Sequence, residues 1–343
     1  MSYGKDEMVR ILSIDGGGMK GIISAIVLQR LEELLRIYSK NENAVISDYF
    51  DLIGGTSTGA IITALLLTPD DCGNAKYSAS DIVSLYKEHG KEIFKKRTLY
   101  PLNTMFGLFG SRYTSKPFEK LLSQYFKDLT LSDMRKDCLC TSYNTSNHKA
   151  VFFSTLSNKG WEKENYLMKD IVLASTAAPT YFPPKQIYNE NCPNNCYIDG
   201  GVIANNPALC LLVESMKMPH HTEIKDTMLL SIGNASNPTY YDYRSVKHWG
   251  YTKWAFAILD ILMDGSEGTV EYQVKKIFDT LHCSDQYLRI EKHMEDEVPK
   301  MEDVSAKAIE KMIQIGDALV KEKDSELKAF AKLLIKEEKN SSK

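Results

Sequence analysis

The sequence predicts an α/β protein with a mostly parallel central sheet flanked by helices, because one three-part unit occurs twice near its N-terminus. Val9–Ile14 is a run of strand formers that ends in Asp15-Gly16-Gly17-Gly18, and an amphipathic helix follows. Tyr49–Gly54 predicts a second strand, which leads through Gly55–Gly59 into the apolar run Ala60–Leu67. The repeated order of strand, glycine turn and helix is typical of parallel α/β folds.

Later segments continue this alternation. We expect helices over Ser80–Phe94, Ser115–Phe126, Tyr166–Ala174 and Pro207–Met216, and strands over Cys138–Tyr143, Ala150–Ser154, Cys196–Ile198, Thr227–Ile232 and Tyr287–Ile290. Two further helices, about Val304–Lys321 and Ser325–Glu337, are expected to close the chain. Since no repeat or low-complexity linker interrupts the pattern, residues 1–343 are expected to form a single domain with its core at about 9–234.

The composition excludes some classes of function. Net charge is -3, from 42 basic and 45 acidic residues, so there is no basic excess of the kind that general nucleic-acid binding needs. Among the seven cysteines, neither Cys138 and Cys140 nor Cys192 and Cys196 has the spacing of a zinc site. We therefore expect reduced thiols, no metal and no other cofactor.

The N-terminal residues MSYGKDEMVRILSID contain no apolar core of signal-peptide length. The longest apolar run, Ala60–Leu67, is too short to cross a bilayer. These features predict a cytoplasmic protein that meets lipid only peripherally, at the membrane surface.

Gly55-Thr56-Ser57-Thr58-Gly59 matches the nucleophile elbow G-x-S-x-G. In such an elbow a sharp turn between strand and helix lifts the serine out of the sheet, and small flanking residues leave room for the strained backbone. The predicted strand before this turn and the apolar helix after it are the context that the motif requires. Ser57 is therefore the candidate nucleophile.

Asp15-Gly16-Gly17-Gly18-Met19-Lys20-Gly21 is a second glycine loop, which could cradle a phosphate or an oxyanion. A phosphate-binding P-loop would need Ser or Thr after Lys20, where this chain has Gly21. The dinucleotide pattern GxGxxG is formally present, but the acidic residue expected at the end of the next strand is missing. A serine nucleophile elsewhere in the site favours an oxyanion hole.

The serine needs a base, and Asp199 is the strongest candidate because it ends a predicted strand and is followed by Gly200 and Gly201. A histidine triad on small soluble esters remains an alternative, since His248, His282 and His293 follow Asp199 in the chain. A lipid-binding or storage protein without catalysis is a third reading, because a fold alone does not establish activity.

Asp15–Gly21, Gly55–Gly59 and Asp199-Gly200-Gly201, in this order, resemble the patatin-like phospholipases, which are related to the catalytic domains of cytosolic phospholipase A2. Three more segments match the family's pattern: Ser175–Pro184, Asp199–Pro207 (DGGVIANNP) and Leu230–Gly233. The resemblance spans about Val9 to Leu334 and looks especially close to plant patatins.

This resemblance implies a lipid acyl hydrolase that cleaves fatty-acyl esters of membrane phospholipids or galactolipids without a metal or cofactor. Carried onto this chain, it implies a Ser57–Asp199 dyad and an oxyanion hole from the N–H groups of Gly16, Gly17 and Gly18. Asp15, Gly21, Gly55, Gly59, Gly200 and Gly201 would support these motifs. Two departures are the lack of a secretory leader and Asp-Gly-Gly where patatins often read Asp-Gly-Ala.

A basic cluster, Lys95-Lys96-Arg97, precedes a loop that contains Phe106 and Phe109. Cations beside aromatic residues suit an anionic membrane surface, so this segment is a candidate for peripheral membrane contact. The alternative is a loop that folds back on the core. The sequence does not fix the oligomeric state.

Overall fold

The central sheet of this computed structural model has eight strands, and its hydrogen-bonded neighbours follow the order β5-β6-β3-β2-β1-β7-β8, with β4 paired to β3. The structure describes residues 8–96, 110–156, 165–188, 194–219, 223–236, 241–295 and 297–341. The strands are β1 (Val9–Ile14), β2 (Leu52–Gly55), β3 (Asp137–Asn144), β4 (Lys149–Ser154), β5 (Lys185–Gln186), β6 (Cys196–Asp199), β7 (Thr227–Ser236) and β8 (Tyr287–His293).

Five of these strands run parallel to one another. β1 pairs with β2 and β7, β2 pairs with β3, and β7 pairs with β8, all in parallel. β4, β5 and β6 form the antiparallel part of the sheet beside β3. The predicted α/β fold with a mostly parallel sheet is therefore confirmed.

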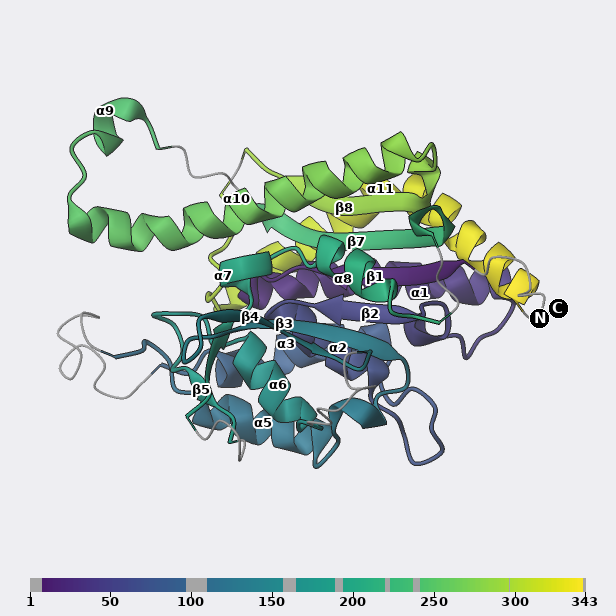
Figure 1. Ribbon diagram of the computed structural model, residues 1–343, viewed down its shortest axis with the longest axis horizontal. Coiled ribbons are helices and arrows are strands. Elements are labelled where there is room, and N and C mark those ends of the chain that lie inside the picture. The colour runs from purple at the N-terminus through teal and green to yellow at the C-terminus, as the bar shows by residue number, and fades with distance from the viewer. Residues whose placement is uncertain are drawn as a thin grey trace.

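Helices cover both faces of the sheet (Figure 1). The helices of the described chain are α1 (Gly21–Ser39), α2 (Thr58–Leu67), α3 (Ala79–Ile93), α5 (Lys116–Phe126), α6 (Met168–Ser175), α7 (Gly201–Ala204), α8 (Ala208–Ser215), α9 (Tyr243–Val246), α10 (Tyr251–Thr280) and α11 (Ala306–Ser341). Because side chains alternate along a strand, Leu12 and Ile14 of β1 face the larger core with α1 and α2, whereas Val9 and Ile11 face a smaller core with α8 and α10.

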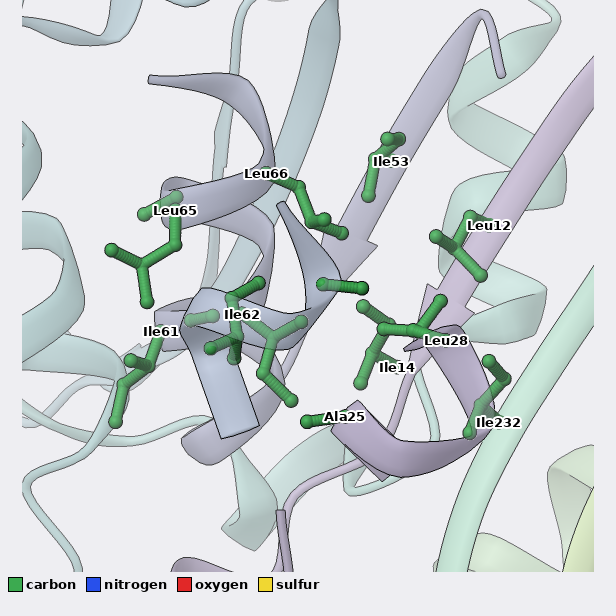
Figure 2. Packing of buried hydrophobic residues seen from close by; sticks show 14 of the residues in the cluster. Leu12, Ile14, Ala25, Leu28, Ile53, Ile61, Ile62, Leu65, Leu66 and Ile232 are labelled. Carbon is green, nitrogen blue, oxygen red and sulfur yellow. The ribbon is translucent and has the colours of Figure 1, made fainter. Parts of the chain in front are cut away.

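The larger core explains why the two N-terminal strand–helix units fold together. Figure 2 shows side chains of β1, β2 and β7 packed against α1 and α2; the labelled residues are Leu12, Ile14, Ala25, Leu28, Ile53, Ile61, Ile62, Leu65, Leu66 and Ile232. Every residue of α2 is buried, so its apolar run faces protein on all sides.

Two expectations from the sequence were wrong or incomplete. The two predicted C-terminal helices are one continuous helix, α11, because Glu322 and Lys323 at the expected break are good helix formers and neither Gly nor Pro stands there. There Asp324 forms ion pairs with Lys328 of the same helix and with Arg30 of α1. The 30-residue helix α10 was not predicted at all. Among the described residues, no helix is both long and apolar enough to cross a membrane.

Candidate active site

β2 and β6 end close together because both pair along the same edge of β3. Gly55, the last residue of β2, pairs with Cys140, and Asp199, the last residue of β6, pairs with Ser142. The opposite edge of β3 is taken by β4 over these positions. Since β2 runs parallel to β3 and β6 runs antiparallel to it, the carboxyl ends of β2 and β6 point toward each other. Their pairing partners on β3, Cys140 and Ser142, are two residues apart.

Ser57 occupies the tight turn between β2 and α2. Its φ of 54° lies in the left-handed region, which is uncommon for residues other than glycine and indicates a strained backbone. The turn is tight enough to exclude side chains at its ends. A Cβ at Gly55 would collide with the backbone of Gly59, and a Cβ at Gly59 would collide with the carbonyl of Ile14.

The Ser57 hydroxyl donates a hydrogen bond to Asp199, with 2.6 Å between Oγ and Oδ2. The other Asp199 oxygen accepts from the Gly201 N–H at 2.7 Å. Burial raises the pKa of Asp199 from its ordinary 3.8 to about 6, although both hydrogen bonds act to lower it. A buried carboxylate at this distance can accept the hydroxyl proton and activate the oxygen as a nucleophile.

The first glycine loop lies beside this pair, but its three glycines are not equivalent. The Gly16 N–H donates to the Asn205 carbonyl at 3.0 Å, and the Gly16 carbonyl accepts from the Asn234 side chain at 2.6 Å. Gly17 and Gly18 line the cavity next to Ser57, and within the described chain their N–H groups have no hydrogen-bond partner. The Gly16 N–H is thus already used to hold the loop, whereas the N–H groups of Gly17 and Gly18 are the candidates for an oxyanion hole.

The first glycine loop is held in place by a buried cluster of charged residues, which was not predicted from the sequence. The Arg289 Nη2 lies 2.6 Å from Asp15, 2.6 Å from Glu291 and 3.0 Å from Glu267. Burial raises the pKa of Asp15 well above its usual range, and the Arg289 guanidinium opposes this rise. Glu267 also accepts from the side chain of Asn205, whose backbone carbonyl holds Gly16.

Asp15, which begins the glycine loop, is thus held by a partner on β8. The other motif glycines allow close packing. A Cβ at Gly21 would collide with Thr58, and one at Gly200 would collide with Thr141. Ser175, also missed from the sequence as a site residue, accepts a hydrogen bond from the Ser57 N–H at 3.0 Å.

A mostly apolar cavity leads to this pair. We call it the Ser57 cavity. Besides Ser57, Asp199, Gly17 and Gly18, its walls include Ile61, Tyr86, Ile93, Phe94, Phe118, Tyr181, Phe182, Met263 and Met301. Such a lining fits a hydrocarbon chain far better than a polar substrate.

No histidine that the structure describes contributes to the Ser57 cavity. His248 and His282 are exposed, and His293 lies beside Ser236 at the end of β8 with 2.8 Å between Nδ1 and Oγ. Across the same described ranges, no group of three or more His, Cys, Asp or Glu residues could hold a metal ion.

The candidate membrane segment is only partly described. Lys95 and Lys96 are exposed. Arg97, Phe106 and Phe109 lie outside the described residues, so their contacts stay a prediction.

Comparison with known proteins places this chain in a family. Residues 12–212 match the family model described as patatin-like phospholipase. Patatin-04/09 and Patatin-15 from Solanum tuberosum are each 33% identical to this chain over 96% of it and 90% of their own length. Patatin-2-Kuras 3 from the same organism is 34% identical over the same shares.

Among solved structures, VipD from Legionella pneumophila aligns with 91% of this chain and 67% of its own, at 14% identity and a TM-score of 0.34, too distant to inform the site. The family match covers most of the chain, and the potato relatives match it nearly end to end. The chain belongs to the patatin-like phospholipase family and is a lipid acyl hydrolase.

Proposed function

We propose that this hydrolase cleaves fatty-acyl esters of membrane glycerolipids, phospholipids or galactolipids, with Ser57 as nucleophile and Asp199 as base. The observation that carries the proposal is the 2.6 Å hydrogen bond from Ser57 Oγ to Asp199 Oδ2 at the wall of an apolar cavity. The pKa of Asp199, raised to about 6, keeps the carboxylate ionised at neutral pH yet makes it a stronger base than an exposed aspartate.

In the first half of the reaction, Ser57 Oγ attacks the ester carbonyl while Asp199 takes the hydroxyl proton. The carbonyl oxygen becomes a tetrahedral oxyanion, which the free N–H groups of Gly17 and Gly18 can stabilise. When the intermediate collapses, the ester bond breaks and the alcohol, a lysolipid, leaves with the proton held by Asp199. An acyl ester on Ser57 remains.

In the second half, Asp199 accepts a proton from water as the water oxygen attacks the acyl ester. A second oxyanion forms in the same position and collapses. The free fatty acid leaves, and the proton returns from Asp199 to Ser57 Oγ. No metal or cofactor enters either half.

The histidine-triad alternative is less well supported, because a triad needs a histidine in hydrogen-bond reach of the serine. The described hydrogen-bond partner of Ser57 Oγ is Asp199. A storage protein without catalysis is also disfavoured, since a strained serine with a buried base is costly to keep in a protein that does not use it.

The test is covalent labelling combined with product analysis. The wild-type protein should react with a fluorophosphonate probe at Ser57 and release fatty acids from a mixed panel of phospholipids and galactolipids, detected by mass spectrometry. Ser57→Ala should lose both, whereas Ser123→Ala, a matched change on α5 away from the cavity, should lose neither. Labelling at a different serine, with hydrolysis intact in Ser57→Ala, would refute the proposal.

A further inference from the structure

Residues 241–262, which comprise α9 and the first part of α10, form a projection from the sheet that we call the arm. Figure 1 shows α9 and the first half of α10 extending well beyond the sheet. Large apolar side chains on the arm face solvent: the exposed fractions are 80% for Tyr243, 40% for Trp254, 42% for Ile258 and 53% for Leu262. The last three lie four residues apart and so share one face of α10.

Aromatic rings gather at the far end of the arm. The ring of Trp249 lies 5.0 Å from Tyr241 and 5.4 Å from Trp254, measured between centroids. With Tyr243, Val246 and Ile261 these residues line an open apolar groove. Trp249 and Trp254 are two of the three tryptophans of the chain. Tryptophan and tyrosine favour the boundary between water and lipid, where the ring is apolar and its polar atom stays hydrated.

Cations accompany these rings. Residues 241–262 contain three basic residues, Arg244, Lys247 and Lys253, against two acidic residues, Asp242 and Asp260, a net charge of +1 in a chain that carries -3. All three cations are exposed, and none forms an ion pair with a described residue. The ammonium of Lys247 lies 5.8 Å from the centroid of the Tyr243 ring. Exposed cations beside aromatic rings are complementary to anionic lipid headgroups.

The same helix reaches the active site. Met263, one residue beyond the exposed face, forms part of the Ser57 cavity wall. One turn further on, Glu267 accepts from the side chain of Asn205 and contacts Arg289, which anchors the glycine loop. A membrane seated on the arm would thus be held by the helix that also forms the cavity wall.

We propose that the arm, residues 241–262, is the membrane-docking surface of this hydrolase, with an anionic phospholipid bilayer as its partner. The inference rests on the proposed function, because it assumes that the substrate is taken from a lipid surface. It is distinct from the segment around Lys95, since the residues that carry it lie on α9 and α10.

Two variants test the proposal by sedimentation with vesicles of phosphatidylcholine containing phosphatidylserine. Arg244→Glu/Lys247→Glu should weaken binding by at least about tenfold, because each basic residue near an anionic surface contributes measurably to affinity. Trp254→Ser/Ile258→Ser should weaken it on vesicles of either composition. The matched controls, Lys275→Glu/Lys276→Glu and Tyr272→Ser, are exposed positions on α10 outside the arm and should bind as the wild type does.

Hydrolysis of a soluble short-chain ester separates this proposal from the proposed function. All four variants should retain the wild-type rate on that ester, which also shows that they fold. If the wild type did not hydrolyse this ester, the proposed function would be wrong. The vesicle-binding results would still test whether the arm is the membrane-docking surface. Equal vesicle binding by wild type and both arm variants would overturn the docking surface. The proposal would also be overturned if the wild type ran as a dimer in gel filtration, the arm variants ran as monomers, and vesicle binding was the same for all of them.

A second measurement does not depend on the stability of those variants. Brominated phospholipids in the vesicles should quench the tryptophan fluorescence of the wild type, and Trp249→Phe/Trp254→Phe should remove most of that quenching. Quenching that persists in this variant would place the contact elsewhere and contradict the proposal.

Discussion

The guanidinium of Arg289 on β8 lies 2.6 Å from the carboxylate of Asp15, 274 residues earlier in the chain at the end of β1. This pair joins the last strand of the sheet to the glycine loop beside Ser57. The Arg289 guanidinium also contacts Glu267 and Glu291, so its positive charge offsets the negative charge of three carboxylates.

Arg289→Gln should therefore destabilise the fold strongly. Removing one partner of a buried ion pair typically costs about 3–5 kcal/mol, since the remaining charges lose their compensation. Denaturant unfolding measures the change. Arg30→Gln, which breaks a half-exposed pair with Asp324, is the control and should have a much smaller effect. Similar losses in the two variants would contradict the assigned role of Arg289.

The pH dependence of hydrolysis should report Asp199. As a base it acts only when ionised, and its pKa is raised to about 6 by burial. The value of kcat/KM on a soluble ester should therefore rise with pH through about 6 and level off above it. A rising limb near pH 4, as for an exposed aspartate, would show that the carboxylate is not buried in the working enzyme.

The same raised pKa makes Asp199 a cost to stability at neutral pH. The folded state binds the Asp199 proton more tightly than the unfolded state, so stability falls as pH rises from 3.8 to about 6. The difference in proton affinity corresponds to about 3 kcal/mol at most. Asp199→Asn stays neutral, so above pH 6 it should unfold at higher denaturant concentration than the wild type. If it unfolds earlier there, the burial argument fails.

Phe118 should help set the length of acyl chain that the enzyme accepts. Phe118 and Phe182, with ring centroids 6.5 Å apart, line both the Ser57 cavity and a second cavity beside Lys185. Phe118→Val should open the wall between them. Each further methylene buried would then gain up to about 0.8 kcal/mol, roughly fourfold in kcat/KM.

A series of esters of increasing chain length measures this preference. Phe126→Val, a buried change on the same helix that touches neither cavity, controls for general loosening. An identical chain-length profile in the wild type and both variants would show that Phe118 does not limit the cavity.

The N-terminal strands and helices could be predicted because their signals are local. The glycine turns after Val9–Ile14 and before Ala60–Leu67 mark where the chain changes direction, and apolar spacing marks the helices. The meeting of Ser57 and Asp199 was expected from their matching positions at strand ends, and the register along β3 gives it a physical basis.

Other features depend on contacts that no local pattern reveals. Gly16 looked equivalent to Gly17 and Gly18, yet its N–H is used by Asn205, far along the chain. Helix α10 escaped prediction because Gly265 and Gly268 lower helix propensity and because apolar residues of its first half face solvent rather than the core. Arg289 could not be paired with Asp15 without knowing the order of the strands.

The central claim is that Asp199, and no histidine, activates Ser57. The most direct test is the rate of hydrolysis of one soluble ester by Asp199→Asn, His248→Ala, His282→Ala and His293→Ala, each checked for folding by circular dichroism. Loss of the general base should reduce the rate of Asp199→Asn by about 10²–10⁴-fold or more. The three histidine variants should each keep most of the wild-type rate. If any one of them is as inactive as Ser57→Ala while still folded, the Ser57–Asp199 dyad is wrong.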